Sequence, residues 1–212
     1  MTSVADVKNI ESYFGSLTSE PAKVFGNEPT LVCIPSQPIE GIVIDQDTKR
    51  PIPNVEISSY SFAGTDPRSK YVGQRVLKTT SDKSGRFRLT GMPNTIGNEI
   101  MAVSKINESD QPYLAKVFEV LPGTAGTPIE MELRLQKGVW ITGKVVDQDT
   151  NQPLGNVRMG YYPASDNEAA LETKTGQSGL LTDIDPRTDK DGNYKLTGVP
   201  GKGVVTALVH MT

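Results

Sequence analysis

Apolar and polar residues alternate over several short stretches of this chain. The clearest are residues 55–58, 86–89, 129–135 and 157–161, in which apolar side chains occupy every second position. This period of two is typical of β-strands that bury one face and expose the other. Stretches rich in Gly, Pro, Asp and Ser separate the strands, so the pattern predicts all-β sandwiches with Greek-key connections.

The chain also repeats itself in two blocks that occur in the same order. Residues 41–55 match residues 143–157 at nine of 15 positions, and residues 82–93 match residues 189–200. The offset between the copies rises from 102 at the first block to 107 at the second, so the second copy carries an insertion. Two ordered matches predict two copies of one module, each of about 100 residues, a common domain size.

The repeat divides the chain into three predicted parts. Residues 38–137 form the first sandwich, and residues 138–212 form a second sandwich that ends about two strands early compared with the first. Residues 1–37 are expected to hold the closing strands of a preceding unit or an N-terminal extension, because Ala22–Phe25 has the same sequence as Ala115–Phe118. We therefore expect the chain to be a window from a longer array.

The repeated motif has a specific order of residue types. It reads Gly-x-Val-x-Asp-x-x-Thr-x-x-Pro-x-x-x-Val, a variable stretch, and then Asp-x-x-Gly-x-Phe/Tyr-x-Leu-x-Gly-x-Pro. This order resembles the carboxypeptidase regulatory-like domain. The resemblance implies a transthyretin-like (prealbumin-like) sandwich, grouped with carbohydrate-binding-like folds, that serves as an accessory domain of secreted or envelope proteins. A fold does not fix a function, so the resemblance alone names no activity.

Several motif residues are predicted to shape turns. Gly41 and Gly143 are expected beside a close backbone neighbour, and Gly85 and Gly192 are expected to take positive φ in a hairpin turn. Short acidic side chains flank the first turn, where they can cap backbone N–H groups. These are Asp45, Asp47, Asp147 and Asp149.

Composition and charge exclude some functions and indicate a location. A net charge of -3 offers no basic surface for nucleic acid. No apolar run approaches the ~18 residues of a membrane span, so no membrane span is expected. The first residues lack the basic and apolar regions of a signal peptide, so a targeting signal would lie outside this window. Together with the resemblance, this predicts an extracytoplasmic location: periplasm, cell envelope or secreted.

The sequence predicts no catalytic site, no cofactor and no metal site. His210 is the only histidine, which excludes a two-histidine metal site, and Cys33 is the only cysteine. A Cys33–His210 nucleophilic pair is an alternative, but neither residue has a Gly-rich elbow.

Asp189–Asn193 lacks the spacing of a calcium loop and predicts a plain hairpin turn. A weak calcium site remains the alternative there, supported by the nearby Asp183 and Asp185.

Aromatic residues are the remaining candidates for a binding site. Tyr60 and Tyr162 occupy the same repeat position, and Trp140 lies near the start of the second copy. Exposed rings of this kind stack on sugars, whereas core or interface packing is the alternative. We therefore predict a non-catalytic spacer, scaffold or docking module whose partners are neighbouring domains or another envelope protein. The alternative is a glycan-binding module, with or without the assistance of calcium. The insertion over residues 164–186 is predicted to be a loop, of which residues 165–178 could be replaced without loss of the fold.

Overall fold

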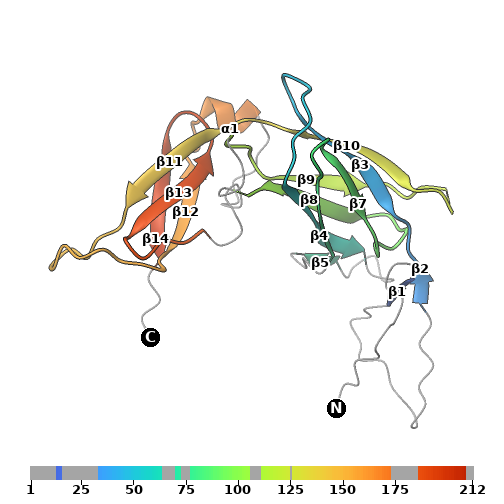
Figure 1. The fold of residues 1–212 in the computed structure, drawn as a ribbon, viewed down its shortest axis with the longest axis horizontal. Helices are drawn as coiled ribbons and strands as arrows, with labels where there is room; N and C mark the ends of the chain where they lie inside the picture. Colours follow the sequence, from blue (N-terminus) through green and yellow to red (C-terminus); the bar gives the residue numbers. More distant parts are fainter. Residues whose placement is uncertain are drawn as a thin grey trace, which may run out of the picture. The chain divides into compact units, whose positions relative to one another are not determined.

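Among the residues that the computed structural model describes, the regular secondary structure is almost all β-strand, which confirms the predicted all-β class (Figure 1). The structure describes residues 13–15, 33–63, 70–72, 77–105, 111–124, 126–172 and 186–208. Two compact units are present. One comprises Met1–Val43, Pro51–Ala102 and Val117–Leu133, and the other comprises Ile44–Arg50, Val103–Lys116 and Arg134–Thr212. The division at residues 38 and 138 stays a sequence-based prediction.

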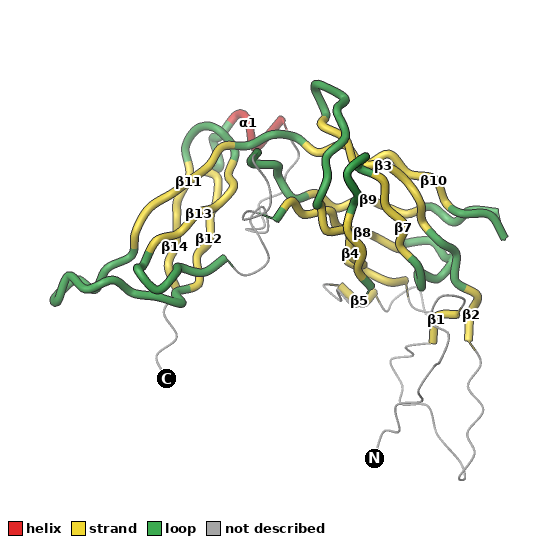
Figure 2. Tube along the Cα trace, in the orientation of Figure 1, coloured by secondary structure: helices red, strands yellow, loops and turns green. Residues whose placement is uncertain are grey.

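Strands of the first repeat lie in two sheets (Figure 2). One sheet has the order β10 (Ile129–Leu135), β3 (Ile39–Asp45) and β7 (Arg86–Leu89). The other has the order β5 (Lys70–Val72), β4 (Val55–Ala63), β8 (Asn98–Ser104) and β9 (Lys116–Val120), and β6 (Lys78–Thr80) also pairs with β4. A separate pair, β1 (Tyr13–Gly15) with β2 (Cys33–Pro35), is antiparallel.

The alternation in the sequence places apolar side chains inside the first repeat. In β7, Phe87 and Leu89 are buried whereas Arg86 and Arg88 are exposed. Both sheets contribute fully buried apolar residues, among them Ile39, Val43, Ile57, Ile100 and Leu133. Each such side chain stabilises the fold by about 1.5–3 kcal/mol through burial, so this core is the main stabilising element of the first repeat.

The second repeat is built from two two-stranded sheets. β11 (Val139–Lys144) pairs with β13 (Asn193–Gly198), and β12 (Arg158–Pro163) pairs with β14 (Gly203–Leu208), both antiparallel. Their inward residues share one core with Leu114, from the segment before β9. The buried members of this core are Leu114, Val157, Met159, Tyr161, Ala170, Leu196 and Val199.

A short helix, α1 (Glu168–Glu172), lies in the insertion that was predicted to be a loop, which corrects that assignment for these residues; the replacement of residues 165–178 stays a prediction. Ala170 lies in the second core, and the buried Asn167 accepts the Ala170 N–H and donates to the Lys202 carbonyl at 2.7 Å. The start of the insertion is therefore structural. Its later part, residues 173–185, lies outside the described residues.

The two repeats share their turn geometry. Gly85 and Gly192 both have positive φ (74° and 80°), as predicted. A Cβ added to Gly192 would lie 2.5 Å from the carbonyl oxygen of Val145. One pair of side-chain hydrogen bonds, called the clamp below, occurs in both repeats and was not predicted. In the first repeat, the buried Ser81 hydroxyl donates to the Ile52 carbonyl and accepts the Val55 N–H, both at 2.9 Å. Thr188 makes the corresponding pair of bonds in the second repeat.

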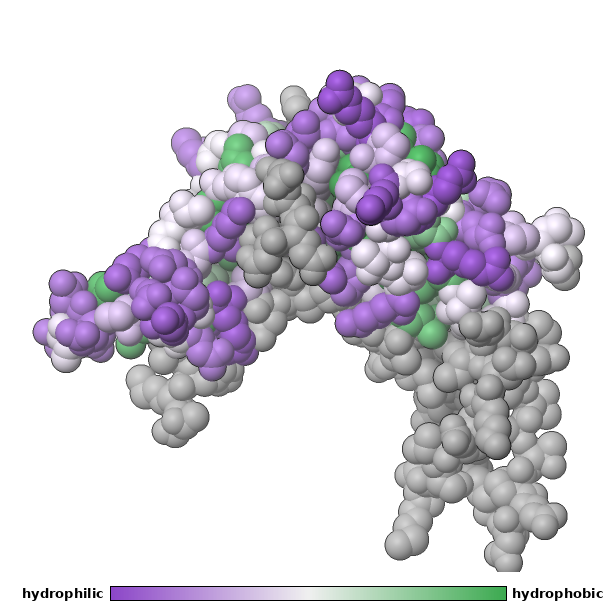
Figure 3. Space-filling view, viewed as in Figure 1, coloured by the Kyte–Doolittle hydropathy of each residue, from purple (hydrophilic) through white to green (hydrophobic). Residues whose placement is uncertain are grey.

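The surface seen in Figure 3 is mostly hydrophilic over the described residues, with scattered apolar side chains. In that same part of the chain, no helix is both long and apolar enough for a membrane span.

Candidate functional site

The most strongly perturbed acidic group of the described residues is Asp45, at the end of β3. The residue is 1% exposed. One oxygen, Oδ1, accepts the N–H groups of Asp47 and Thr48 at 2.9 and 2.8 Å. These bonds close a tight turn, as predicted for an aspartate at this motif position.

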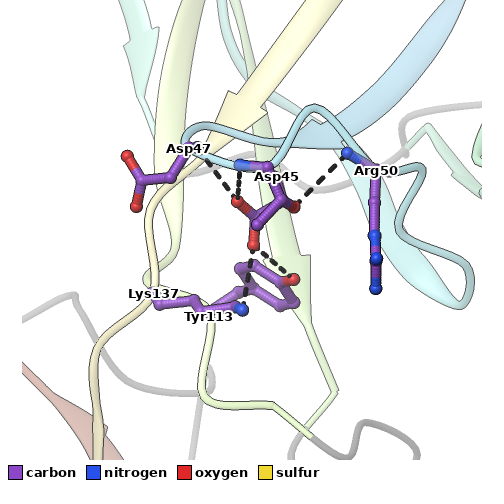
Figure 4. A network of polar contacts seen from close by, with 6 residues as sticks. Asp45, Asp47, Arg50, Tyr113 and Lys137 are labelled. Atoms are coloured by element: carbon purple, nitrogen blue, oxygen red, sulfur yellow. Dashed lines mark hydrogen bonds and ion pairs between the residues drawn. The ribbon is translucent and has the colours of Figure 1, made fainter.

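The second carboxylate oxygen of Asp45 is held by two residues that are distant in sequence (Figure 4). Its Oδ2 accepts the Tyr113 hydroxyl at 2.9 Å and lies 3.3 Å from the Lys137 Nζ. Tyr113 and Lys137 also form a backbone bridge. The buried carboxylate therefore fastens the first turn of the repeat to the segments before β9 and after β10.

These contacts shift the pKa values of Asp45 and Tyr113. Burial alone would raise the pKa of Asp45, but hydrogen bonds from the Thr48 N–H, the Tyr113 hydroxyl, the Asp47 N–H and Lys137 hold that pKa well below its usual range. Burial, together with the hydrogen bond to Asp45, raises the pKa of Tyr113. At neutral pH the cluster is a carboxylate held by a neutral phenol and an ammonium. Such a carboxylate is a hydrogen-bond acceptor and ion-pair partner.

Asp147, the counterpart of Asp45, makes the same hydrogen bonds within its own turn. Its Oδ1 accepts the N–H groups of Asp149 and Thr150 at 3.1 and 2.8 Å and the Thr150 hydroxyl at 2.8 Å. The bonds from Thr150 and Asp149 lower the pKa of this carboxyl as well. Among the described residues, no tyrosine or lysine from a distant segment bonds to its second oxygen, in contrast to Asp45.

The sequence did not predict Tyr113 and Lys137 as partners of Asp45. Tyr113 is 68 residues away from Asp45 along the chain. Neither residue belongs to the repeated motif, so no local signal marks it.

The three predicted ligand-binding aromatics lie on different sheets. Tyr60 is partly buried in β4. Trp140 is partly buried in β11, and the Lys195 Nζ lies 3.8 Å from the centroid of its ring, so an ammonium already covers one ring face. Tyr162 is the most open of them, at 44% exposed in β12. Trp140 and Tyr162, both in the second repeat, therefore do not combine into one aromatic platform.

Tyr162 belongs to a small apolar patch on the outer face of the β12–β14 sheet. It lies opposite Val204 in the strand register, and Arg158 lies opposite Leu208. Val204 and Leu208 are 59% and 56% exposed. A Cβ added to Gly160 would come within 3.3 Å of the Tyr162 ring, so the ring lies across this glycine. The patch could contact the apolar face of a sugar ring or a protein surface.

A shallow hollow of about 290 Å³ lies on the first repeat. It is lined by Gly41, Ile42, Arg86, Glu130, Met131 and Glu132. No aromatic ring lines this hollow, and the charged side chains that line it include both positive and negative ones. The hollow therefore offers no stacking surface of the kind that was predicted for a glycan.

The Asp189–Asn193 segment forms the predicted hairpin turn. The Asp189 carboxylate accepts the N–H groups of Asp191 and Asn193 at 2.9 Å each, and the Asn193 side-chain amide at 3.1 Å. Over the residues that the structure describes, no group of three His, Cys, Asp or Glu side chains is placed to hold a metal ion. Asp183, Asp185 and His210 lie outside those residues, as does the side chain of Cys33.

Comparisons with known proteins give no family assignment. No protein-family model matches the chain, and no curated protein matches it. Among solved structures, the chain is similar to a streptococcal ancillary pilin, with 14% identity, 94% of this chain and 71% of that chain covered, and a TM-score of 0.31. It is also similar to GBS52, the minor pilin of Streptococcus agalactiae, with 17% identity, coverage of 83% and 84%, and a TM-score of 0.28. For the shaft pilin SpaA of Lactobacillus rhamnosus GG, the identity is 12%, the coverage is 82% and 88%, and the TM-score is 0.32. Such low identities and TM-scores do not establish a common fold, and the all-β class rests on the chain's own strands.

Proposed function

We propose that this chain is a non-catalytic structural and interaction module of a larger extracytoplasmic protein. In this proposal its two repeats are tandem transthyretin-like sandwiches of the carboxypeptidase regulatory-like type, and they act as a spacer, scaffold or docking domain. The motif resemblance supports the fold type, and the repeated turn geometry supports the tandem arrangement. Neighbouring domains or another envelope protein are the proposed partners.

The observation that carries this proposal is the Asp45 cluster. Catalytic carboxylates keep a reactive oxygen open to substrate, and their pKa values are tuned toward the working pH. Asp45 does neither, because both of its oxygens are bonded inside the protein and its pKa is depressed. The most perturbed carboxylate among the described residues thus fastens segments of the fold together.

The backbone after β10 supports a structural role for the same region. The Leu114 N–H donates to the Gln136 carbonyl at 2.9 Å, and the Gly138 N–H donates to the Pro112 carbonyl at 2.6 Å. The segment that leads from β10 to β11 is therefore bonded to the fold along its length. This is the behaviour of a structural connection with little slack, unlike a flexible Gly/Ser linker.

Glycan binding is the second candidate function, favoured by the exposed ring of Tyr162 beside Val204. A glycan array and a thermal melt with and without calcium separate the two functions. A structural module retains no glycan, and its melting temperature does not change with calcium. Glycan retention that Tyr162→Ala abolishes and Tyr60→Ala preserves would overturn the structural proposal in favour of the second candidate. A rise in melting temperature with calcium would establish a calcium site.

A further inference from the structure

The sheet formed by β11 and β13 turns one of its faces to the core of the second repeat. Ile141 and Leu196 pack in that core. Side chains alternate between the two faces of a strand, so the neighbours of these residues lie on the outer face. The strand register places six side chains there: Trp140 opposite Thr197, Thr142 opposite Lys195, and Lys144 opposite Asn193. This outer face therefore carries two lysines and no acidic residue.

The two lysines are exposed, and one of them is held by an aromatic ring. The Lys195 Nζ lies 3.8 Å from the centroid of the Trp140 ring, a cation–π contact that restricts the lysine. Lys144 lies on the neighbouring strand, at a diagonal separation that long side chains can span. The Asp189 carboxylate senses the charge of Lys144 but uses both oxygens for hydrogen bonds inside its own turn. Over the residues that the structure describes, neither ammonium forms an ion pair.

The first repeat neutralises the corresponding cation within its own sheet. Arg88 is the counterpart of Lys195, at the offset of 107 residues, whereas the position of Thr142 is taken by Glu40, at the offset of 102. Arg88 lies opposite Glu40 in the register of β3 and β7, and the two side chains form an ion pair. The second repeat keeps the cation at this position but has a threonine in place of the carboxylate. Lys195 therefore occupies the sheet position of an ion-pair member without an acidic residue opposite it.

We propose that an acidic segment of another protein docks on the outer face of the β11–β13 sheet. A glutamate or aspartate of this partner lies beside Thr142 and pairs with Lys195, in the position that Glu40 has in the first repeat. A second acidic residue of the partner pairs with Lys144. The exposed Thr142 hydroxyl donates to the first carboxylate, because a hydroxyl can act as a donor to an ionised acid.

The aromatic ring favours a protein partner over an acidic polysaccharide. Sugars stack on the open face of an aromatic ring, whereas the Lys195 ammonium already covers one face of Trp140. Charge is therefore the main attraction that this face offers, and complementary charge both steers association and selects the partner. The inference rests on the proposed docking role and names the chemistry of the partner.

The test uses the full chain and dye-labelled poly-L-glutamate at pH 7 and low salt. Anisotropy of the dye measures binding, and the fluorescence of Trp140, the single tryptophan, reports whether binding occurs at this face. The wild type is expected to bind, to change its tryptophan emission, and to release the polymer in about 1 M salt, because salt screens exposed charges. Lys195→Gln is expected to weaken binding about twofold to fivefold, the range of an exposed ion pair. Lys202→Gln, which removes a lysine that pairs with Asp166, is the matched control and is expected to bind as the wild type does.

Substitutions at Thr142 give the sharpest result. Thr142→Glu restores the acidic residue that the first repeat has at this position, so its carboxylate pairs with Lys195 inside the chain and repels an incoming acid. It is expected to abolish binding. Thr142→Gln has nearly the same shape without the charge and is expected to keep the wild-type affinity. Melting curves check that both variants are folded.

Several results would overturn the inference. They are a wild type that does not bind, equal binding by Thr142→Glu and Thr142→Gln, and an equal loss in Lys195→Gln and Lys202→Gln. Polygalacturonate, an acidic polysaccharide, is titrated in parallel, and binding as strong as that of poly-L-glutamate would overturn the assignment of a protein as the partner. None of these outcomes involves Tyr162 or calcium, so failure of this docking face is distinct from failure of the proposed structural role.

Discussion

Replacing Tyr113 with phenylalanine tests the role of the Asp45 cluster directly. Tyr113→Phe removes the hydroxyl that donates to the Asp45 Oδ2 at 2.9 Å and leaves the buried ring in place. A hydrogen bond to a charged group contributes about 1.5–3 kcal/mol to stability. Asp45 is 1% exposed, so water does not readily replace the lost donor. We therefore expect the free energy of unfolding to fall by an amount in this range at pH 7.

The pH dependence of this loss follows from the direction of the pKa shift. The folded-state pKa of Asp45 lies below the ordinary value of 3.8, so the stability that its carboxylate contributes is complete above that value and is lost as the pH falls through the folded pKa. Without the Tyr113 hydroxyl, the folded pKa of Asp45 moves back toward the ordinary value. The difference in unfolding free energy between wild type and Tyr113→Phe is therefore full at pH 7 and narrows as the pH falls below about 4.

Tyr161→Phe is the matched control. The buried Tyr161 hydroxyl donates to the Val199 carbonyl at 3.1 Å, which is a neutral acceptor. Its loss is expected to cost about 0.5–1.5 kcal/mol, independent of pH in the acid range. Urea unfolding followed by the fluorescence of Trp140, the single tryptophan, measures both variants. A Tyr113→Phe loss that is smaller than the control's, or that stays constant down to acid pH, would refute the charged hydrogen bond as a stabilising contact.

Three further predictions concern the packing and turns of the repeats. Leu196→Ala empties a fully buried position and is expected to cost 2–5 kcal/mol of unfolding free energy, whereas Leu208→Ala, at a site 56% exposed, is expected to cost less than about 0.5 kcal/mol. Gly192→Ala adds a steric collision to the cost of positive φ, so it is expected to lower the melting temperature more than Gly126→Ala, whose φ is 85° but whose Cβ would meet nothing within 4 Å. Ser81→Ala removes both the donor and the acceptor of a buried clamp and is expected to cost about 1–3 kcal/mol in urea unfolding. Equal losses of stability for the two leucine variants or for the two glycine variants would contradict the assigned packing. A Ser81→Ala variant with unchanged unfolding free energy would contradict the assigned hydrogen bonds.

Local features of the fold were predictable from the sequence. A period of two depends only on neighbouring residues, so the strands around Val55–Ala63 and Ile129–Leu135 follow from the pattern. The turn at Gly85 was predictable for the same reason, because a residue with positive φ inside a tight hairpin must be free of a Cβ clash. The close approach at Gly41 was also predicted, and the Met131 backbone accounts for it.

Features that depend on residues far apart were not predictable. One local feature was missed as well, since Lys49 and Asn54 adopt positive φ (61° and 60°), as do their counterparts in the second repeat, although neither is a glycine. The structure of the insertion was missed because Asn167 acquires its role only when the Lys202 carbonyl comes within 2.7 Å. The candidate ligand residues Tyr60, Trp140 and Tyr162 stay a prediction.

The turn at Asp45 and Asp147 separates what a short sequence encodes from what the surrounding fold adds. Both aspartates begin the same Asp-Gln-Asp-Thr sequence and both cap the same two N–H groups, so the turn itself is encoded locally. Only Asp45 is buried, because only its repeat has a described closing segment that brings Tyr113 and Lys137 to the second oxygen. Burying a carboxylate costs several kcal/mol unless donors compensate, so a closing strand and its donors have to arrive together. A strand that covers β11 would therefore have to bring a hydroxyl or an ammonium group to Asp147, or leave that carboxylate in contact with water.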